Sequence, residues 1–411
     1  ERKIYMADLK FIDGGVCAPI GFVANGIHCG IRKNKTALDL ALIAGGKDCD
    51  VAAVYTQNLV CGAPITVTKR NIIDGKARAI VCNSGIANTC NTDGVEKAQQ
   101  TCEIVAKELG ISPADVVVAS TGVIGVPLNI EPIKNGVGEL VNGLDSDGSD
   151  KAARAIMTTD TRKKEVAVEF YMDDKLCKIG AISKGSGMIH PNMATMLSFI
   201  TTDVNITSQA LQMALDEVVA DSFNMLSVDG DTSTNDTVCV LANGFAQNMR
   251  IVSSGKYFDI FVDALRQCCI YLAREMARDG EGATKLIECT VSNASDEQTA
   301  KKIAKSVICS SLVKTAMFGA DANWGRVLCA IGYSGADIDI SKVDVSFVSK
   351  NGTLDVCKNG AGINFSEEIA KQVLSSDSIE ICVNLNEGKS SATAFGCDLT
   401  YDYVKINGDY R

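Results

Sequence analysis

A single threonine stands where a polar loop changes into an apolar segment. Residues 184–194 include glycine, serine, proline and asparagine close together, which favours a loop. After Thr195 the chain reads Met-Leu-Ser-Phe-Ile-Thr-Thr, a pattern that predicts a strand buried on at least one face. The small Ala194 leaves the peptide bond before Thr195 open to attack by the threonine hydroxyl. If that bond broke, the freed α-amine of Thr195, with a pKa near ~8, would serve as its own general base.

A second hydroxyl group follows a predicted strand at residues 114–119. Thr121 precedes Gly122, so a hydroxyl and an unhindered backbone N–H lie side by side, and such a pair can hold negative charge that develops on a carbonyl oxygen. On the residues alone, structural roles are favoured over chemical ones. Thr195 is then the first residue of a strand, Thr121 is part of a turn, and Lys184 is a solvated surface lysine.

No cluster of residues in the sequence predicts a metal ion or a cofactor. Residues 229–236 begin like a calcium loop, but Thr234 takes the place of the sharp-turn glycine and Val240 that of the bidentate glutamate. We interpret this segment as a hydrogen-bonded structural loop. The absence of a Cys-x-x-Cys pair and the presence of only 2 histidines argue against a zinc site.

Two other features near Thr195 have plain interpretations. The segment Gly185-Ser-Gly187 is too short to cradle a phosphate and lacks the following Lys-Ser/Thr. His190 is close to Thr195 in the sequence, but an amino-terminal threonine already supplies a base, so we interpret this histidine as a neighbour and not as a member of a catalytic triad.

Composition narrows the class of protein and its partners. The chain has 411 residues, 46% of them apolar, which is enough for a large core and two or more domains. Its net charge of −10, with no basic stripe, argues against nucleic acid and membrane surfaces as partners. The 17 cysteines stand in apolar contexts, which indicates free thiols, and no stretch resembles an export signal or a membrane span. We expect a soluble, cytoplasmic enzyme.

The periodicity of the chain predicts a mixed α/β fold. Helices are expected at 95–109, 151–157, 208–223 and 257–278, and 36–42 is expected to be a short helix or strand. A β-hairpin is expected from 165–170 and 176–182, with further strands at 51–56, 65–68, 79–82, 114–119, 236–242, 286–292, 343–348, 379–385 and 391–396. No linker separates domains cleanly. We expect a catalytic α/β region at 1–285 and a C-terminal α/β region at 286–411 that contributes to the substrate pocket.

These motifs together are similar to the ornithine acetyltransferase family, also called the glutamate N-acetyltransferase family. The similarity extends over nearly the whole chain in the family's order: Gly14-Gly15, Ser120–Gly125, Met157–Thr161, Lys184–Asp203 and Asn407. The resemblance implies a mixed α+β layered sandwich with self-processing like that of the N-terminal nucleophile enzymes. One departure is the loop at 83–92, where Ile86 and Thr89 replace residues common in the family.

The resemblance also implies roles for individual residues. The bond between Ala194 and Thr195 is cleaved by the protein itself, which gives chains 1–194 and 195–411, and Thr195 becomes the nucleophile. Thr121 and Gly122 form the oxyanion hole. The residues that match substrate contacts of the family are Thr158, Lys184, Thr195, Glu281 and Asn407. Their chemistry is reasonable, because a lysine suits an α-carboxylate and a carboxylate suits an ammonium group.

The activity implied by the resemblance is acetyl transfer from N2-acetylornithine to glutamate, by a ping-pong mechanism through acetyl-Thr195, in arginine biosynthesis. It implies no cofactor, small-molecule substrates and an α2β2 heterotetramer of cleaved chains. The sequence leaves open whether acetyl-CoA is a second donor. Two alternatives are a self-processing amide hydrolase or aminopeptidase of related architecture and a non-catalytic amino-acid-binding protein. Hydrolysis without an acceptor would favour the first, and binding without self-cleavage or turnover the second.

Overall fold

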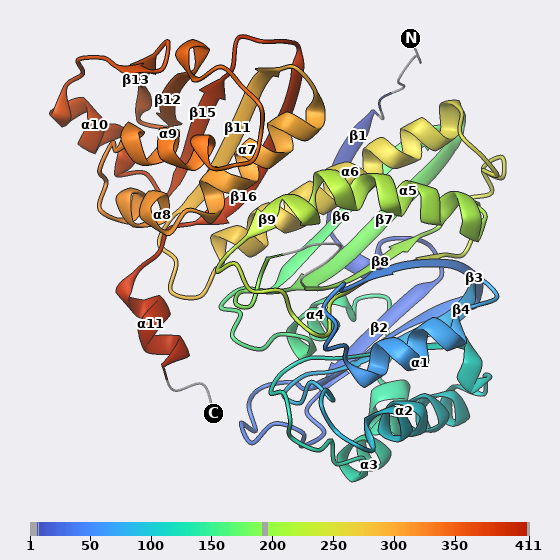
Figure 1. The fold of residues 1–411 in the computed structure, drawn as a ribbon. Helices are drawn as coiled ribbons and strands as arrows, with labels where there is room; N and C mark the ends of the chain where they lie inside the picture. The colour runs from blue at the N-terminus through green and yellow to red at the C-terminus, as the bar shows by residue number, and fades with distance from the viewer. Residues whose placement is uncertain (1–5, 7, 191–195, 409–411) are drawn as a thin grey trace. The chain divides into compact units, whose positions relative to one another are not determined.

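The computed structural model describes residue 6 and the ranges 8–190 and 196–408 of the chain (Figure 1). The chain forms two compact units. Unit 1 comprises residues 1–185, 191–220 and 232–272, and unit 2 comprises residues 186–190, 221–231 and 273–411, in each case as far as the structure describes them.

Unit 1 is built on a nine-stranded sheet in the order β1-β6-β7-β8-β10-β3-β4-β5, with β2 paired to β3. Its strands are β1 (Leu9–Ile12), β2 (Phe22–Ile27), β3 (Leu40–Tyr55), β4 (Lys76–Asn83), β5 (Val116–Ser120), β6 (Lys164–Met172), β7 (Lys175–Lys184), β8 (Leu197–Thr202) and β10 (Thr237–Ala242). Its helices are η1 (Gly15–Cys17), α1 (Ala63–Asn71), α2 (Gly94–Leu109), η2 (Pro113–Asp115), α3 (Glu131–Asn142), α4 (Ser149–Ala155), α5 (Ser208–Asp221) and the first part of α6 (Lys256–Arg278).

The long strand β3 folds this sheet into two layers. Its first part, residues 40–44, pairs with β2 and β4, whereas its last part, residues 50–55, pairs with β10. The register of the β3–β4 pair shifts between Ala44 and Cys49, where two glycines interrupt the strand. Such an irregularity allows a strand to bend. As a result, β7, β8 and β10 face β2, β4 and β5 across a common core.

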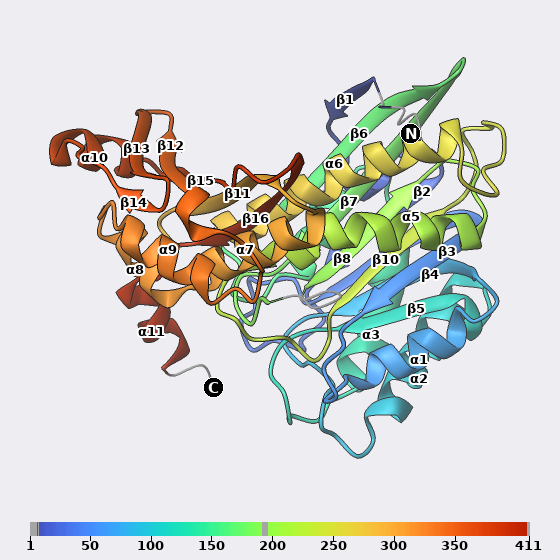
Figure 2. The same ribbon diagram turned by 45° about the horizontal axis from the view of Figure 1, so that its top comes forward.

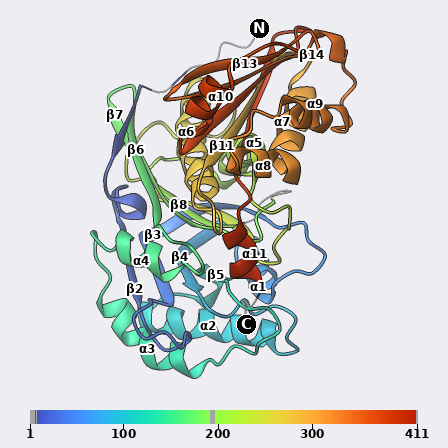
Figure 3. The same cartoon turned by 90° about the vertical axis from the view of Figure 1, so that its left-hand side faces the viewer.

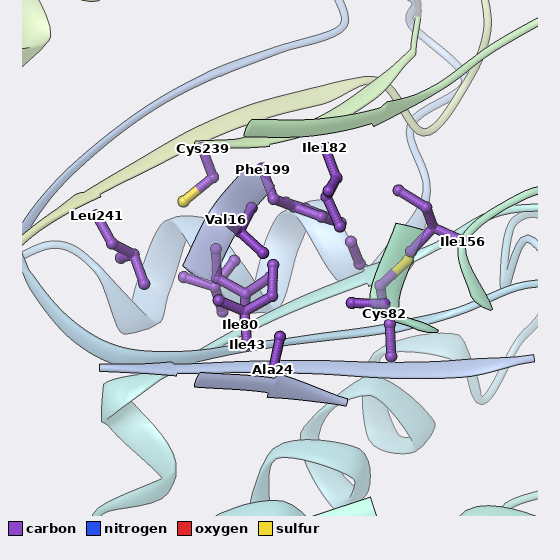
Figure 4. Close-up of a cluster of buried hydrophobic side chains, with 14 of the residues drawn as sticks. Val16, Ala24, Ile43, Ile80, Cys82, Ile156, Ile182, Phe199, Cys239 and Leu241 are labelled. Atoms are coloured by element: carbon purple, nitrogen blue, oxygen red, sulfur yellow. The ribbon is translucent and has the colours of Figure 1, made fainter. Parts of the chain in front are cut away.

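Apolar side chains from both layers fill the space between them. Figure 4 shows Ile182, Phe199, Cys239 and Leu241 from one layer pointing toward Ala24, Ile43, Ile80 and Cys82 from the other. Helices α1, α2 and α3 cover the outer face of the second layer, with α2 and α3 side by side (Figure 3). Helices α5 and α6 run along the outer side of β7 and β8 (Figure 1). The resulting arrangement is a layered α+β sandwich, as the family resemblance implied.

Unit 2 contains a seven-stranded sheet in the order β14-β13-β12-β15-β11-β16-β9. Its strands are β9 (Leu226–Ser227), β11 (Leu286–Ala294), β12 (Asp344–Ser349), β13 (Gly352–Lys358), β14 (Ala361–Gly362), β15 (Ser378–Asn384) and β16 (Ser390–Cys397). Its helices are η3 (Phe223–Met225), the end of α6, α7 (Glu297–Cys309), α8 (Ser311–Phe318), α9 (Trp324–Gly332), η4 (Ile340–Lys342), α10 (Glu367–Leu374) and α11 (Tyr401–Asn407). Helix α7 packs along β11 and β16 (Figure 2).

The structure corrects one predicted strand. Residues 65–68 lie in helix α1 because Gly62 caps the helix and a proline occupies its first turn, and this local signal prevails over the β-branched residues. The Thr68 hydroxyl also donates to the Val118 carbonyl oxygen (2.7 Å) and accepts from the Val118 N–H (2.9 Å), which ties α1 to β5. The predicted hairpin is confirmed as β6 and β7, and residues 40–42 of the uncertain 36–42 segment belong to β3.

The predicted regions 1–285 and 286–411 stay a prediction. Among the residues that the structure describes, no helix is both long and apolar enough to cross a membrane.

Candidate active site

The predicted nucleophile, Thr195, and its neighbour Ala194 lie outside the described residues, which resume at Met196. Met196 is buried, and its carbonyl oxygen accepts a hydrogen bond of 2.9 Å from the Thr237 N–H. Leu197 then pairs with Lys184 on one side and with Thr237 on the other. The predicted strand after Thr195 is therefore confirmed as β8, a central strand buried along its whole length.

Lys184 and Thr121 come together at one end of unit 1. Lys184 is the last residue of β7, Thr121 follows β5, and the Lys184 Nζ donates to the Thr121 Oγ1 at 3.2 Å. The two residues are 63 positions apart in the sequence and five strands apart in the sheet, and they meet because β3 folds one layer over the other. Both residues are at least nine-tenths buried, with 9% and 8% exposure. Lys184 is thus not the solvated surface lysine that its residue type alone suggested.

Asp160 ties together three segments beside Lys184 through its carboxylate. Its carboxylate, whose side chain is fully buried, accepts from the Lys164 Nζ (2.6 Å) and from the backbone N–H groups of Gly185 (2.8 Å) and Thr158 (3.0 Å). Burial alone raises the pKa of Asp160, but the positive charges of Lys164 and Lys184, together with these hydrogen bonds, outweigh it and lower the pKa to about 2. One carboxylate therefore faces two ammonium groups, which leaves a net positive charge beside Thr121.

The turn at Gly122 depends on glycine. Its φ is +128°, and a Cβ atom would lie 2.2 Å from the Gly85 carbonyl carbon. The N–H groups on either side are bonded, that of Thr121 to the Asn83 oxygen and that of Val123 to the Gly85 oxygen. Within the described part of the chain the Gly122 N–H itself has no hydrogen-bond partner. Since the Thr121 hydroxyl accepts from Lys184, its proton remains available, and the turn presents two donors.

Asn235 supports this turn from a loop that the sequence singled out only as a failed calcium site. Its Nδ2 donates to the carbonyl oxygens of Ala87 (2.6 Å) and Ser120 (2.9 Å), and its Oδ1 accepts from the hydroxyls of Thr89 and Thr234 (2.6 Å each). The amide is buried and bonded on both ends. The interpretation of residues 229–236 as a hydrogen-bonded structural loop is therefore confirmed.

In unit 2, Glu281 and Asn407 form a pair. The Asn407 Nδ2 donates to the Glu281 Oε2 at 2.7 Å, and the Glu281 N–H donates to the Ser186 carbonyl oxygen at 2.8 Å. A Cβ atom on Gly187 would lie 2.3 Å from the Glu281 carboxyl carbon, so a larger residue there would displace the Glu281 carboxylate. Glu281 is buried, whereas Asn407 lies near the end of α11, a helix without a buried residue.

His190 lies on the segment that precedes the predicted cleavage site. Its Nδ1 lies 3.0 Å from the Ser227 hydroxyl and 3.6 Å from the Cys309 sulfur. Burial and the nearby charge of Lys305 lower the pKa of His190 to about 4, so the imidazole is neutral at physiological pH. Its predicted status as a neighbour of the nucleophile stays a prediction, because Thr195 is outside the described residues.

The predicted site residues that the structure describes fall into two sets. Thr121, Gly122 and Lys184 are brought together in unit 1, and the backbone of Thr158 joins them through Asp160. Glu281 and Asn407 are brought together in unit 2. Sequence reasoning missed the supporting roles of Asp160 and Asn235, although both belong to polar motifs that it had noted. The sequence signal that could have found them is a polar side chain inside a noted motif: Asp160 stands two residues after Thr158, and Asn235 stands in the 229–236 loop.

The layered α+β fold, with a lysine and two hydrogen-bond donors at the ends of its strands, fits an acyl-transferring enzyme. The model of the ArgJ family matches residues 23–411, and the chain belongs to this family. Family membership confirms the resemblance drawn from the motifs and the predicted enzyme class, an N-acetyltransferase.

Curated relatives match nearly the whole chain. It is similar to the Arginine biosynthesis bifunctional protein ArgJ 1 of Clostridium acetobutylicum, with 52% identity over 95% of this chain and 96% of that protein. The Arginine biosynthesis bifunctional protein ArgJ of Caldanaerobacter subterraneus is 48% identical over 98% of this chain and 100% of that protein. A solved structure of the Arginine biosynthesis bifunctional protein argJ from Bacillus halodurans is 47% identical, with a TM-score of 0.50, and covers 52% of this chain and 99% of that chain.

Proposed function

We propose that this enzyme transfers an acetyl group from N2-acetylornithine to glutamate, giving ornithine and N-acetylglutamate, as a step of arginine biosynthesis. The proposal rests on family membership and on the names of the relatives, which are bifunctional proteins of arginine biosynthesis. The observation that carries the chemistry is the buried Lys184–Thr121 contact beside the unbonded Gly122 N–H. It provides a cation for a carboxylate and two donors for an oxyanion in one place.

The first half-reaction places the acetyl group on Thr195. The α-amine of Thr195 accepts the hydroxyl proton while the Oγ bonds to the acetamide carbon, and the carbonyl oxygen takes up negative charge between the Thr121 hydroxyl and the Gly122 N–H. The carbon–nitrogen bond then breaks as the proton passes to the leaving amine of ornithine. Each oxyanion donor is expected to contribute about 3 to 4 kcal/mol to the transition state.

The second half-reaction runs in the opposite direction with a new amine. The amine of glutamate attacks the acetyl ester, its proton passes through the Thr195 α-amine to the Oγ, and the ester bond breaks. Donor and acceptor share an α-amino-acid end, so Lys184 can hold the α-carboxylate of each in turn. From the family resemblance we assign Thr158, Glu281 and Asn407 to the substrate as well, Glu281 through its charge toward an ammonium group.

We further propose that the chain cleaves itself between Ala194 and Thr195 and assembles as an α2β2 heterotetramer in the cytoplasm. The Bacillus halodurans chain spans 52% of this chain, which is the length expected of residues 195–411. Freshly purified protein should show two bands on a denaturing gel. Thr195→Ala should leave one band, whereas Thr195→Ser, which keeps a hydroxyl, should still be cleaved. A single full-length species with full activity would contradict the proposal.

The covalent intermediate has a direct test. With N2-acetylornithine alone, mass spectrometry of the 195–411 chain should show one added acetyl group, and glutamate should remove it. Double-reciprocal plots should be parallel, because neither substrate needs the other to be bound. Intersecting lines without an acetylated chain under rapid quench would mean direct transfer in a ternary complex and would remove the role of Thr195.

A second donor is suggested by the word bifunctional in the names of the relatives. We propose that acetyl-CoA also acetylates Thr195, which would make the protein an N-acetylglutamate synthase in addition. Offering acetyl-CoA and N2-acetylornithine separately, with glutamate as acceptor, distinguishes one activity from two. Release of acetate without an acceptor would instead favour an amide hydrolase.

A further inference from the structure

A hollow in unit 1 lies at the other ends of the strands that lead to Lys184. It has a volume of about 500 Å³ and is formed where β3 bends, where β4 begins and where the chain leaves β8 and β10. Lys184 pairs with Leu197 at the start of β8, whereas this hollow includes Asn205, beyond the end of the strand. A strand of this length spans roughly 20 Å, so the hollow is separate from the proposed active site.

The hollow is positively charged in a protein with a net charge of −10. Four cations and two carboxylates line it: Lys47, Lys76, Arg78, Arg250, Asp48 and Asp50. The local net charge is therefore +2, against the sign of the whole chain. Such a concentration of positive charge on an acidic protein attracts anions locally.

Each carboxylate of the hollow is already engaged. Asp50 accepts from the Lys76 Nζ (3.0 Å) and the Ser208 N–H (3.2 Å) through one oxygen and from Arg250 (3.4 Å) through the other. Asp48 lies 3.5 Å from the Arg78 Nε. These ion pairs position the cationic side chains and leave some of their N–H groups free to donate hydrogen bonds.

Donors remain after this pairing. Each guanidinium has five N–H groups, and among the described residues Arg250 uses one of them toward Asp50 while Arg78 makes only its ion pair with Asp48. Lys47 lies over the ring of Phe245 at 4.3 Å, a contact that leaves its N–H groups free for a ligand. The hollow thus presents several cationic donors from three segments, and both of its carboxylates are paired with its own cations.

We propose that this hollow binds a small molecule that carries a phosphate or diphosphate group. Two arginines suit the oxygen geometry of phosphate, because a guanidinium donates two parallel hydrogen bonds, and two lysines add point charges. The volume exceeds that of a single phosphate ion and accommodates a diphosphate. This hollow is distinct from the proposed site of acetyl transfer, and its binding of a phosphate group does not depend on that chemistry.

Isothermal titration with inorganic pyrophosphate tests the proposal. Wild-type protein should bind one pyrophosphate per chain saturably, and more weakly as the salt concentration rises. Arg250→Gln and Arg78→Gln should each weaken binding about tenfold, since each removes charge-assisted hydrogen bonds. Asp48→Asn should strengthen binding, because it removes a negative charge that competes with the ligand for Arg78. Lys175→Gln, which removes an exposed lysine of another ion pair in the same unit, is the matched control and should change nothing.

Titrations with ATP, adenosine and phosphate distinguish the sources of this chemistry. Tighter binding of ATP than of pyrophosphate, with none of adenosine, would identify a nucleotide, and equal binding would identify a free diphosphate. Circular dichroism of each variant establishes that the fold is kept. Absence of saturable pyrophosphate binding to the wild type, or equal binding by all the variants, would overturn the proposal, whether or not the protein transfers acetyl groups.

Discussion

The two groups of proposed site residues are held in very different ways. In unit 1, Lys184 and Thr121 are buried at strand ends, and Asp160 and Asn235 bond the backbone beside them. In unit 2, Glu281 is buried, but its partner Asn407 is on a short helix without a buried residue. The proposed oxyanion donor Thr121 and the proposed carboxylate ligand Lys184 are thus preorganised, whereas the proposed substrate contacts of unit 2 depend in part on an exposed element. Catalysis gains most from rigid placement of the groups that meet the transition state.

The largest expected effect comes from removing the buried charge in unit 1. Asp160→Ala leaves Lys164, of which 1% is exposed, without its carboxylate, and we expect a loss of about 3 to 5 kcal/mol in the free energy of unfolding. Denaturant unfolding measures this loss. Asp174→Ala, which breaks an exposed pair with Lys175, is the control and should cost less than about 1 kcal/mol. If the two changes lowered the free energy of unfolding equally, the Asp160 network would add no more stability than an exposed ion pair.

The next largest expected effect is on the rate of catalysis and not on the stability of the fold. Thr121→Ala should lower kcat about 10² to 10³-fold and change KM little, because the oxyanion exists only in passing. Thr121→Ser keeps the hydroxyl and should retain most of the activity. Steady-state kinetics with N2-acetylornithine separates the two parameters. A rise in KM with an unchanged kcat would assign Thr121 to substrate binding in place of the oxyanion hole.

A smaller effect is expected in unit 2. Asn407→Ala removes one hydrogen bond to Glu281, which is worth about 0.5 to 1.5 kcal/mol, and should raise KM by up to about tenfold while kcat stays close to its value. Lys405→Ala on the same helix is the matched control. A loss of kcat as large as that of Thr121→Ala would show that unit 2 takes part in the chemistry and not only in recognition.

The last expected effect is a difference in pH dependence between the units. Burial lowers the pKa of His190 from 6.5 to about 4, so the unfolded chain binds more protons in this window and the histidine makes folding less favourable as the pH falls through it. Asp160, with its pKa lowered from 3.8 to about 2, loses its contribution only below that window. Between pH 6.5 and 4, His190→Gln should therefore flatten the fall in stability, which hydrogen exchange can follow in each unit. An unchanged curve would contradict the shift.

Several elements of the fold were predictable because their signals are local. Alternating apolar residues on either side of Asp173-Asp174 predicted the β6–β7 hairpin, and apolar residues three and four positions apart predicted α2. The strand after Thr195 followed from its apolar run. The prediction failed at residues 65–68, where helix capping and the bond of Thr68 to Val118 oppose the β propensity of the residues.

The sequence by itself determined the family, the residue types of the site and the threonine proposed to carry the acetyl group, because each of these depends on short motifs read in order. Only the tertiary structure decided that Lys184 is buried against Thr121, that Asp160 balances its charge and that Asn235 supports the turn. The reason is the bend in β3: contacts between residues 63 positions apart depend on how the layers fold over one another, and no local pattern encodes that geometry.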